Sequence, residues 1–327
     1  MPVPTDAWVQ IGASTTPAFS KDGRTLYHLR GFGLPQVFAM DLDGGNVRQL
    51  SHHDEKVAFL RRCPADDQLI WGIDAGGDER QQFWLLEPGA QTRALTEAPD
   101  AIHDFGAWSA DGARIAFTEV GVTHIDQAPE RGGISFVASA AGGAWSAPQR
   151  LVPSVAGKNR YYPAIAPDGS FVVYDESTCP AGKTYDRVCN GDTDPSARLF
   201  AASFPPAAPA PVELAAANAP GVADRGATDL GTSYPKWNPF PFRVSAQSQI
   251  VWLTFSSLRR YGLRPSPPPA SSHEGLPNGT LIWMAAIDPA KLASGQDPSS
   301  AAFCLPFQDI TTSNHIAQWT SGVATVP

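Results

Sequence analysis

Charged residues are scarce in this chain of 327 residues, and basic residues are the scarcer kind. Lysine and arginine number 24 against 32 aspartates and glutamates, which gives a formal net charge of −8 and an isoelectric point near 5.3. No run of basic residues interrupts this balance. Because nucleic acids and anionic membranes are bound largely through positive charge, we expect neither as a partner.

Long apolar runs are also missing. No stretch reaches the roughly 18 residues that a membrane-spanning helix needs, so we expect no membrane span. The first ten residues, MPVPTDAWVQ, lack the basic and apolar segments of a secretory signal. The sequence is therefore compatible with a cytoplasmic protein, and equally with an exported one whose signal has been removed.

Cysteine is rare, with four residues and no C-x-x-C pair. Cys179 and Cys189 flank one loop and could form a local disulfide. Free thiols are the alternative, and the choice depends on the redox compartment, which the sequence leaves open.

Glycine and proline are plentiful, with 29 and 31 residues, and they occur in the turns of a repeated pattern of short strands. The clearest copy is FGAWSADGARIAFT at residues 105–118, in which an aromatic strand enters an Asp-Gly corner and a second, alternating strand leaves it. Asp-Gly between alternating strands is typical of a hairpin with a two-residue turn, because glycine adopts positive φ without steric cost.

The pattern recurs along the chain. Related phrases begin at Thr16, Leu60 and Tyr162, and a degenerate copy covers 234–240 with 249–257. The corner aspartates Asp22 and Asp66 are 44 residues apart, Asp66 and Asp111 are 45 apart, and Asp111 and Asp168 are 57 apart. A period in the forties with strand–turn–strand content is typical of propeller blades. The sequence therefore predicts an all-β fold, a β-propeller of four-stranded blades.

We expect one propeller domain over 1–327, in a monomer. Asn314–Val323 resembles the first strand of a blade that Ala7–Ile11 would complete, which favours six blades over five. One short helix near the C-terminus is predicted by Asp288 as N-cap, Pro289 at the first position and Gly295 as the stop. The expected blades cover about 12–51, 57–96, 104–152, 161–215 and 234–310, with the closing blade from 314–323 and 7–11.

Several phrases go beyond the generic repeat and carry a family resemblance. GLPQVFAMDLDGGNVRQLSHHDEKV (33–57), DAGGDERQQFWLL (74–86) and AIHDFGAWSADGARIAFT (101–118) resemble the propeller of the prolyl oligopeptidase and acylaminoacyl peptidase family. The repeat itself, a PD-type and WD-like pattern, is shared with TolB-type propellers. The C-terminal half resembles uncharacterised bacterial TolB-like proteins through STCP…CNGDTDP, NAPGV, YPKW and SNHIAQW.

The resemblance implies a fold and no catalysis. In that peptidase family the propeller gates access to a separate α/β-hydrolase domain, which needs about 200 residues. Here no G-x-S-x-G nucleophile elbow occurs. We therefore expect a non-catalytic propeller that binds a protein or peptide, as TolB-type propellers do. The alternative is a regulatory or gating propeller that acts with a separately encoded serine peptidase.

One loop offers oxygen ligands for a hard cation. Asn190, Asp192 and Asp194 in CNGDTDP are spaced closely enough to bind Ca²⁺, although no Glu occupies the twelfth position of an EF-hand. The alternative, which we favour, is that these side chains turn the chain by bonding to backbone groups. No other cofactor is expected.

Two further charged segments have a structural interpretation that we prefer over a functional one. His52–Glu55 (HHDE) combines metal-binding residue types, and Gly76–Arg80 (GGDER) offers Arg80 as an anchor for a partner. We interpret the first as a solvated connector between blades and the second as a hairpin tip. His124 and Asp126 have a spacing compatible with one strand face, and nothing else converges on them. His103 lies just before the inner strand of a blade, where it resembles a structural position of the peptidase family, and His315 likewise precedes an inner strand.

Seven tryptophans recur at strand positions, and we expect them to pack between blades: Trp71, Trp84, Trp108, Trp237, Trp252, Trp283 and Trp319.

Long insertions indicate where a partner would bind. Ser177–Ala197 interrupts the fourth blade and Ser257–Gly279 interrupts the fifth. Insertions in repeat proteins tend to collect on one functional face, so these two loops are the interaction surface that the sequence predicts.

Overall fold

A computed structural model describes most of the chain. The described residues are 15–31, 33–89, 91–120, 132–140, 143–178, 194–205, 210–220, 230–240, 242–243, 249–259, 280–309 and 312–319.

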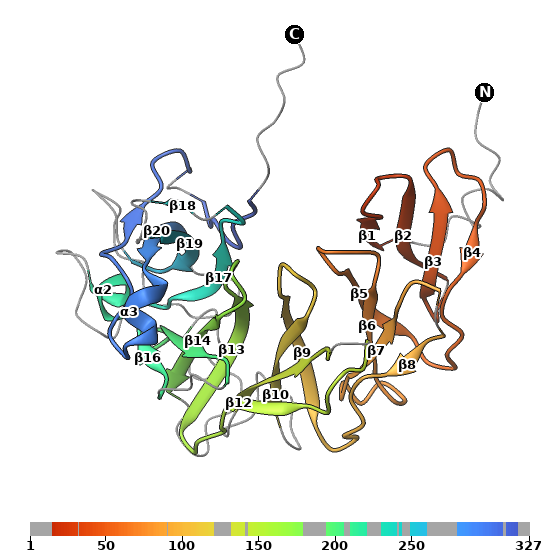
Figure 1. Cartoon of the computed structure of the whole chain (residues 1–327), viewed down its shortest axis with the longest axis horizontal. Helices are drawn as coiled ribbons and strands as arrows, with labels where there is room; N and C mark the ends of the chain where they lie inside the picture. The colour runs from red at the N-terminus through yellow and green to blue at the C-terminus, as the bar shows by residue number, and fades with distance from the viewer. Residues whose placement is uncertain are drawn as a thin grey trace, which may run out of the picture. The chain divides into compact units, whose positions relative to one another are not determined.

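The strands form five successive antiparallel sheets, each with its strands in chain order (Figure 1). This up-and-down arrangement is the topology of a propeller blade, so the all-β propeller prediction is confirmed. Blade 1 consists of β1 (Thr15–Phe19), β2 (Thr25–Arg30), β3 (Gln36–Asp41) and β4 (Arg48–Gln49). Blade 2 consists of β5 (Val57–Arg62), β6 (Leu69–Ile73), β7 (Gln82–Leu86) and β8 (Arg93–Ala94).

The remaining blades follow the same order, with one small addition. Blade 3 is β9 (Ile102–Trp108), β10 (Arg114–Val120), β11 (Gly133–Ala138) and β12 (Gln149–Val152). Blade 4 is β13 (Lys158–Ile165), β14 (Phe171–Thr178), β15 (Arg198–Ser203) and β16 (Val212–Glu213). Blade 5 is β17 (Ser233–Trp237), β19 (Gln249–Ser257), β20 (Leu281–Ile287) and β21 (Phe303–Cys304), and β18 (Phe242–Arg243) pairs with β19.

The hairpin corners differ from the predicted two-residue turn. In blade 1, Ser20 and Thr25 close the hairpin through Ser20 N–H to Thr25 O (2.8 Å), so four residues lie between them. Gly23 has φ of +70°, whereas Asp22 does not have positive φ. The aspartate instead accepts a hydrogen bond from the backbone N–H of Arg24 at 3.0 Å. This side-chain bond stabilises a wider turn with glycine as its only left-handed residue.

The same aspartate-to-backbone hydrogen bond recurs in three other blades, although the corner of blade 2, Asp66-Asp67, contains no glycine. The pairs are Gln68 N–H to Asp66, Ala113 N–H to Asp111, and Ser170 N–H to Asp168, at 2.9–3.0 Å. The sequence repeat is therefore a repeat of one hydrogen-bonded corner.

The innermost strands of blades 1, 4 and 5 share an unusual backbone. Thr16, Tyr162 and Tyr234 have φ of +49° to +52°, and each lies where the pairing register with the next strand shifts. Each also precedes a proline. Bulges of this kind increase strand twist. Ile316 has φ of +53°, so the segment before Trp319 has the same bend, although the structure assigns no strand to 312–319.

The predicted short helix is present as α3 (Pro289–Ala293). Asp288 accepts a hydrogen bond from Ala290 N–H at 3.0 Å, and Gly295 has φ of +73°. A second helix, α2 (Ala215–Asn218), was not predicted.

Residue contacts divide the chain into two compact units, each with its own apolar core. The first unit comprises Met1–His103, Ala110–Ala113 and Ala138–Pro148, and the second comprises the rest. Blades 1 and 2 share a core that includes Leu29, Val37, Leu60 and Trp71. Blades 4 and 5 share a core that includes Phe171, Leu199, Phe255 and Trp283.

The closing blade stays a prediction. Ala7–Ile11 and residues 320–323 lie outside the described residues, while 314–319 is held against blade 5. Asn314 N–H donates to Thr280 O at 2.8 Å, Ile316 N–H donates to Ser256 Oγ at 3.2 Å, and Trp319 Nε1 donates to Thr254 Oγ1 at 3.1 Å. The single-domain prediction for 1–327 also stays open.

Candidate functional site

Most of the residues that the sequence singled out as ligands lie outside the described part of the chain. The residues outside it include Cys179, Cys189, Asn190 and Asp192. His124, Asp126 and most of both predicted interaction loops also lie outside it. The disulfide and the calcium site therefore stay predictions. Within the described residues, Cys63 and Cys304 are buried thiols, and no group of three His, Cys, Asp or Glu side chains is placed to bind a metal.

Asp194 is the one calcium candidate that the structure describes. Its Oδ1 accepts hydrogen bonds from the backbone N–H of Ser196 at 2.7 Å and from Ser196 Oγ at 2.6 Å, and the residue is almost fully buried. These bonds turn the chain into β15, which is the role that we favoured for this aspartate.

The two charged segments of the N-terminal half meet at one end of blade 2. Glu55 lies just before β5, and Gly76 lies just after β6. Gly76 N–H donates to Glu55 Oε1 at 2.9 Å. In an antiparallel meander, neighbouring strands run in opposite directions. One end of the sheet therefore carries the start of the first and third strands and the end of the second and fourth strands. The connector and the hairpin tip are therefore neighbours.

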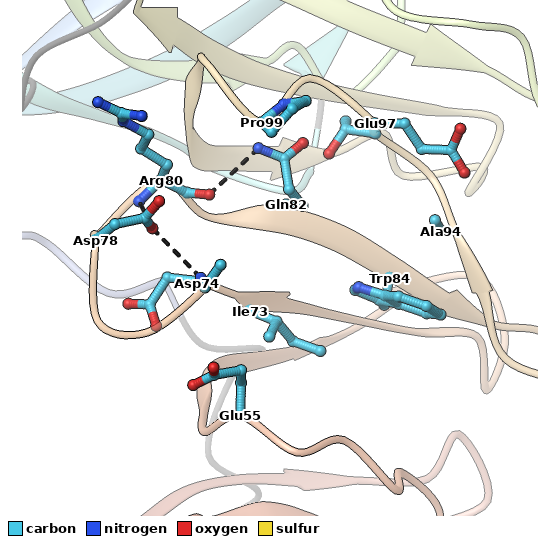
Figure 2. A pocket seen from close by; sticks show the side chains of 12 residues that line it. Glu55, Ile73, Asp74, Asp78, Arg80, Gln82, Trp84, Ala94, Glu97 and Pro99 are labelled. Atoms are coloured by element: carbon cyan, nitrogen blue, oxygen red, sulfur yellow. Dashed lines mark hydrogen bonds between the residues drawn. The ribbon is translucent and has the colours of Figure 1, made fainter.

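This edge encloses a pocket of about 360 Å³, within the size range of small ligand sites (Figure 2). All of its walls come from the first unit. Ile73, Trp84, Ala94 and Pro99 contribute apolar surface. The other lining residues are Glu55, Asp74, Ala75, Asp78, Arg80, Gln82, Thr96 and Glu97. We call this cavity the blade-2 pocket.

The wall opposite the hairpin tip is fixed by one amide side chain. Gln82 Nε2 donates to Ala98 O at 2.9 Å and to Ala101 O at 3.1 Å, and Ala98 N–H donates to Gln82 Oε1 at 2.9 Å. The same Nε2 contacts Arg80 O at 3.2 Å. The segment after β8 is thereby held in place, so the shape of the pocket is formed before any ligand arrives.

The aromatic wall is held by a histidine beside it. The ring of His53 contacts Trp84 edge-on with centroids 4.6 Å apart, and His53 Nε2 accepts a hydrogen bond from Trp71 Nε1 at 3.2 Å. Burial lowers the pKa of His53, the neighbouring charge of His52 lowers it further, and Asp54 opposes the shift. The acceptor role and the lowered pKa both favour the neutral ring.

Negative charge predominates around the pocket. Four carboxylates line it, against the single guanidinium of Arg80. In Figure 2 the carboxylates of Glu55, Asp74 and Asp78 lie toward the side away from Trp84, and the guanidinium of Arg80 extends away from them. Asp74 is 4% exposed, and its Oδ1 accepts no hydrogen bond from the described residues.

Among the described residues, His103, His315 and several of the seven tryptophans have packing contacts. His103 is buried, with Nδ1 3.0 Å from Gln81 O, and His315 contacts Tyr234 edge-on. Trp71 and Trp283 are buried, and Trp237 donates from Nε1 to Ala164 O of the preceding blade at 3.0 Å. Trp84 is the exception, because it lines the pocket.

The pocket was not predicted from the sequence. His52–Glu55 and Gly76–Arg80 each have a local structural interpretation, as a connector and as a hairpin tip. The signal was their position at matching ends of consecutive predicted strands, which places them at one sheet edge.

Comparison with known proteins gives structural similarity alone. No protein-family model and no curated protein sequence matches the chain. Among solved structures, a protein assigned as TolB from Agrobacterium tumefaciens aligns over 90% of this chain and 80% of its own length, with 14% identity and a TM-score of 0.44. The propeller domain of the Trilobed protease from Pyrococcus furiosus aligns over 83% and 68%, with 12% identity and a TM-score of 0.45.

A puromycin-hydrolysing peptidase from Mycobacterium tuberculosis is also similar, with 14% identity and a TM-score of 0.43. The alignment covers 89% of this chain but 47% of that peptidase. These proteins belong to the two groups of propellers that the repeat phrases resemble. Alignments at this level transfer no function, and the fold assignment rests on the strand order of the blades. In the described part of the chain no helix is long and apolar enough to span a membrane.

Proposed function

We propose that this chain is a non-catalytic β-propeller that binds a protein or peptide. The blade-2 pocket is the observation that carries the proposal. Ligand sites are concave and largely apolar, with a few polar groups that fix orientation. The pocket combines apolar walls from Ile73, Trp84 and Ala94 with four carboxylates among its lining residues.

The exposed tip beside the pocket favours a macromolecular ligand over an enclosed small molecule. Residues 75–79, between β6 and β7, are exposed, and so are Glu97 and Pro99 on the other side. A peptide that inserts one side chain would therefore contact exposed chain on both sides of the opening. Half-buried tryptophan in such a position is a frequent source of binding energy.

The experiment that tests this proposal is selection of peptides from a random displayed library on the immobilised chain. Enriched peptides are then titrated against the protein and against Trp84→Ala. We expect this variant to weaken binding by about tenfold or more, as loss of an interface anchor does.

The matched control is Trp252→Ala, since Trp252 is also a half-buried tryptophan on a blade strand but lies in blade 5. It should leave peptide binding unchanged. Failure to enrich any peptide, or equal affinity for Trp84→Ala and the unaltered chain, would contradict the proposal.

A hydrolase partner is the outcome that would favour the alternative. If the tagged chain retains a serine peptidase from cell extract, and the peptidase's rate on long substrates changes on binding, the chain is a gating propeller. The purified chain alone should hydrolyse neither peptide nor ester substrates, because its sequence contains no nucleophile elbow.

A further inference from the structure

The charge of the blade-2 pocket narrows the kind of ligand that fits. Four acidic side chains and one basic side chain line it, so the lining carries a net negative charge at neutral pH. In Figure 2 the carboxylates of Asp78, Asp74 and Glu55 follow one another along the side opposite Trp84, and the Arg80 guanidinium extends away from them. A cationic group entering this cluster gains attraction from each carboxylate, and the gain is larger in a cavity than in open solvent.

Glu55 and Asp78 each use one carboxylate oxygen to accept hydrogen bonds from the backbone of the β6–β7 loop. Glu55 accepts from Gly76 N–H through Oε1, and Asp78 accepts from Ala75 N–H at 3.3 Å and from Arg80 N–H at 3.0 Å, both through Oδ1. Asp74 Oδ1, by contrast, is buried without a donor among the described residues. A buried acceptor without a donor costs free energy that an incoming N–H group recovers.

The apolar walls exclude a bare metal ion as the natural occupant. Within the described residues no three carboxylate, imidazole or thiolate side chains converge on a point, as a metal would require. Ile73, Ala94 and the indole of Trp84 instead offer surface for a hydrocarbon stem. A side chain with an aliphatic stem and a cationic head satisfies both ends of the pocket.

We propose that the blade-2 pocket binds an arginine or lysine side chain of a peptide partner, with its stem against Trp84 and its cationic head among Glu55, Asp74 and Asp78. This proposal rests on the peptide-binding function proposed above and specifies its selectivity. The head donates charge-assisted hydrogen bonds, which are about twice as strong as neutral ones.

The test compares three tripeptides that differ at one side chain: acetyl-Gly-Arg-Gly-amide, the same peptide with citrulline, and the same peptide with leucine. Citrulline keeps the shape of arginine but is neutral. Titrations followed by ligand-observed NMR should give a dissociation constant for the arginine peptide at least about tenfold lower than for the citrulline peptide. Raising the salt concentration should reduce this ratio.

Asp74→Asn should reduce the arginine preference to about threefold or less. Glu55→Gln provides a second variant, because glutamine keeps an acceptor for Gly76 N–H while it removes the charge. Asp43→Asn is the matched control, since Asp43 is exposed in the β3–β4 turn and asparagine can still accept from Gly45 N–H. It should retain the full preference. Thermal unfolding of each variant confirms that it is folded.

Equal affinity for the arginine and citrulline peptides would overturn the proposal, and so would an arginine preference that persists in both pocket variants. Absence of binding by all three tripeptides would overturn it as well. None of these outcomes decides the proposed function, because selection from the displayed library also detects peptides without basic residues. Library peptides that depend on Trp84 but contain no arginine or lysine would leave peptide binding in place and remove its charge selectivity.

Discussion

At the scale of single residues, His53 connects the core of blade 2 to the pocket. Its ring contacts two indoles, with centroid distances of 4.6 Å to Trp84 and 6.1 Å to Trp71, and its Nε2 accepts a hydrogen bond from Trp71 Nε1. Protonation would place a donor opposite that N–H and a charge in a partly buried site. The side chain that positions the aromatic wall is therefore sensitive to acid.

The pH dependence of stability follows from the direction of the shift. The pKa of His53 in the folded chain is below the ordinary value of 6.5, mainly because of burial. An unfolded chain binds a proton near pH 6.5 while the folded chain does not, so the unfolded state gains protons first as pH falls. The stability contributed by the neutral ring is complete above that pH and is lost below it.

We expect the free energy of unfolding, measured by urea titration, to fall between about pH 7.5 and pH 5.5, and to fall less in His53→Gln. His28 in blade 1 also has a lowered pKa, so some dependence should remain. His52→Gln, a change at the exposed neighbour, is the control and should keep most of the slope. If His53→Gln and the unaltered chain show the same slope, His53 does not titrate as inferred.

At the scale of elements, the two short helices show which local structure the sequence can predict. α3 has its own signals, an aspartate cap followed by proline and a terminal glycine, and it was predicted at the correct position. α2 has none, because its N-cap Leu214 makes no side-chain bond. The backbone N–H groups of Ala216 and Ala217, in its first turn, donate to the side chains of Asp297 and Ser299, about 80 residues further along the chain. A helix that is capped from a distance leaves no local pattern.

The cap of α3 yields a prediction for a whole element. Asp288→Ala removes the acceptor for Ala290 N–H, and loss of such a cap costs about 1 kcal/mol of stability. Asp288→Asn keeps a capping oxygen and should cost much less. Urea unfolding of the two variants measures the difference. Equal loss in both would mean that the charge, and not the hydrogen bond, stabilises the helix.

The turns and the pocket show a similar limit. The Asp-Gly corners were located correctly, but the turn was wrong because the aspartate bonds to the backbone and widens the loop. Five repeats became five sheets, since alternation and turn residues are local. The pocket depends on which loops share a sheet edge, and on the Gly76 to Glu55 bond that joins them. The contact between these two segments cannot be predicted from the sequence of either segment alone.

At the scale of the whole molecule, the sixth blade is a prediction that involves segments near both ends of the given sequence. The segment 314–319 lies against blade 5 through three hydrogen bonds, and Ile316 repeats the left-handed bend of the innermost strands. The sequence predicts that Ala7–Ile11 completes that blade. An unpaired strand edge would otherwise remain.

We therefore expect a chain that lacks residues 1–11 to unfold at a temperature lower by about 2 °C or more. A chain that lacks residues 1–4 is the control and should unfold at the unaltered temperature. Calorimetry of the three proteins makes the comparison. If removal of 1–11 leaves the transition unchanged, the five described blades need no strand from the N-terminal end.

The blade-2 pocket has one more property that matters beyond this chain. All of its lining residues fall between Glu55 and Pro99, so a single uninterrupted segment encodes the complete site. Each repeat of such a fold is one supersecondary unit. The binding preference proposed for the pocket would therefore belong to one repeat as a whole.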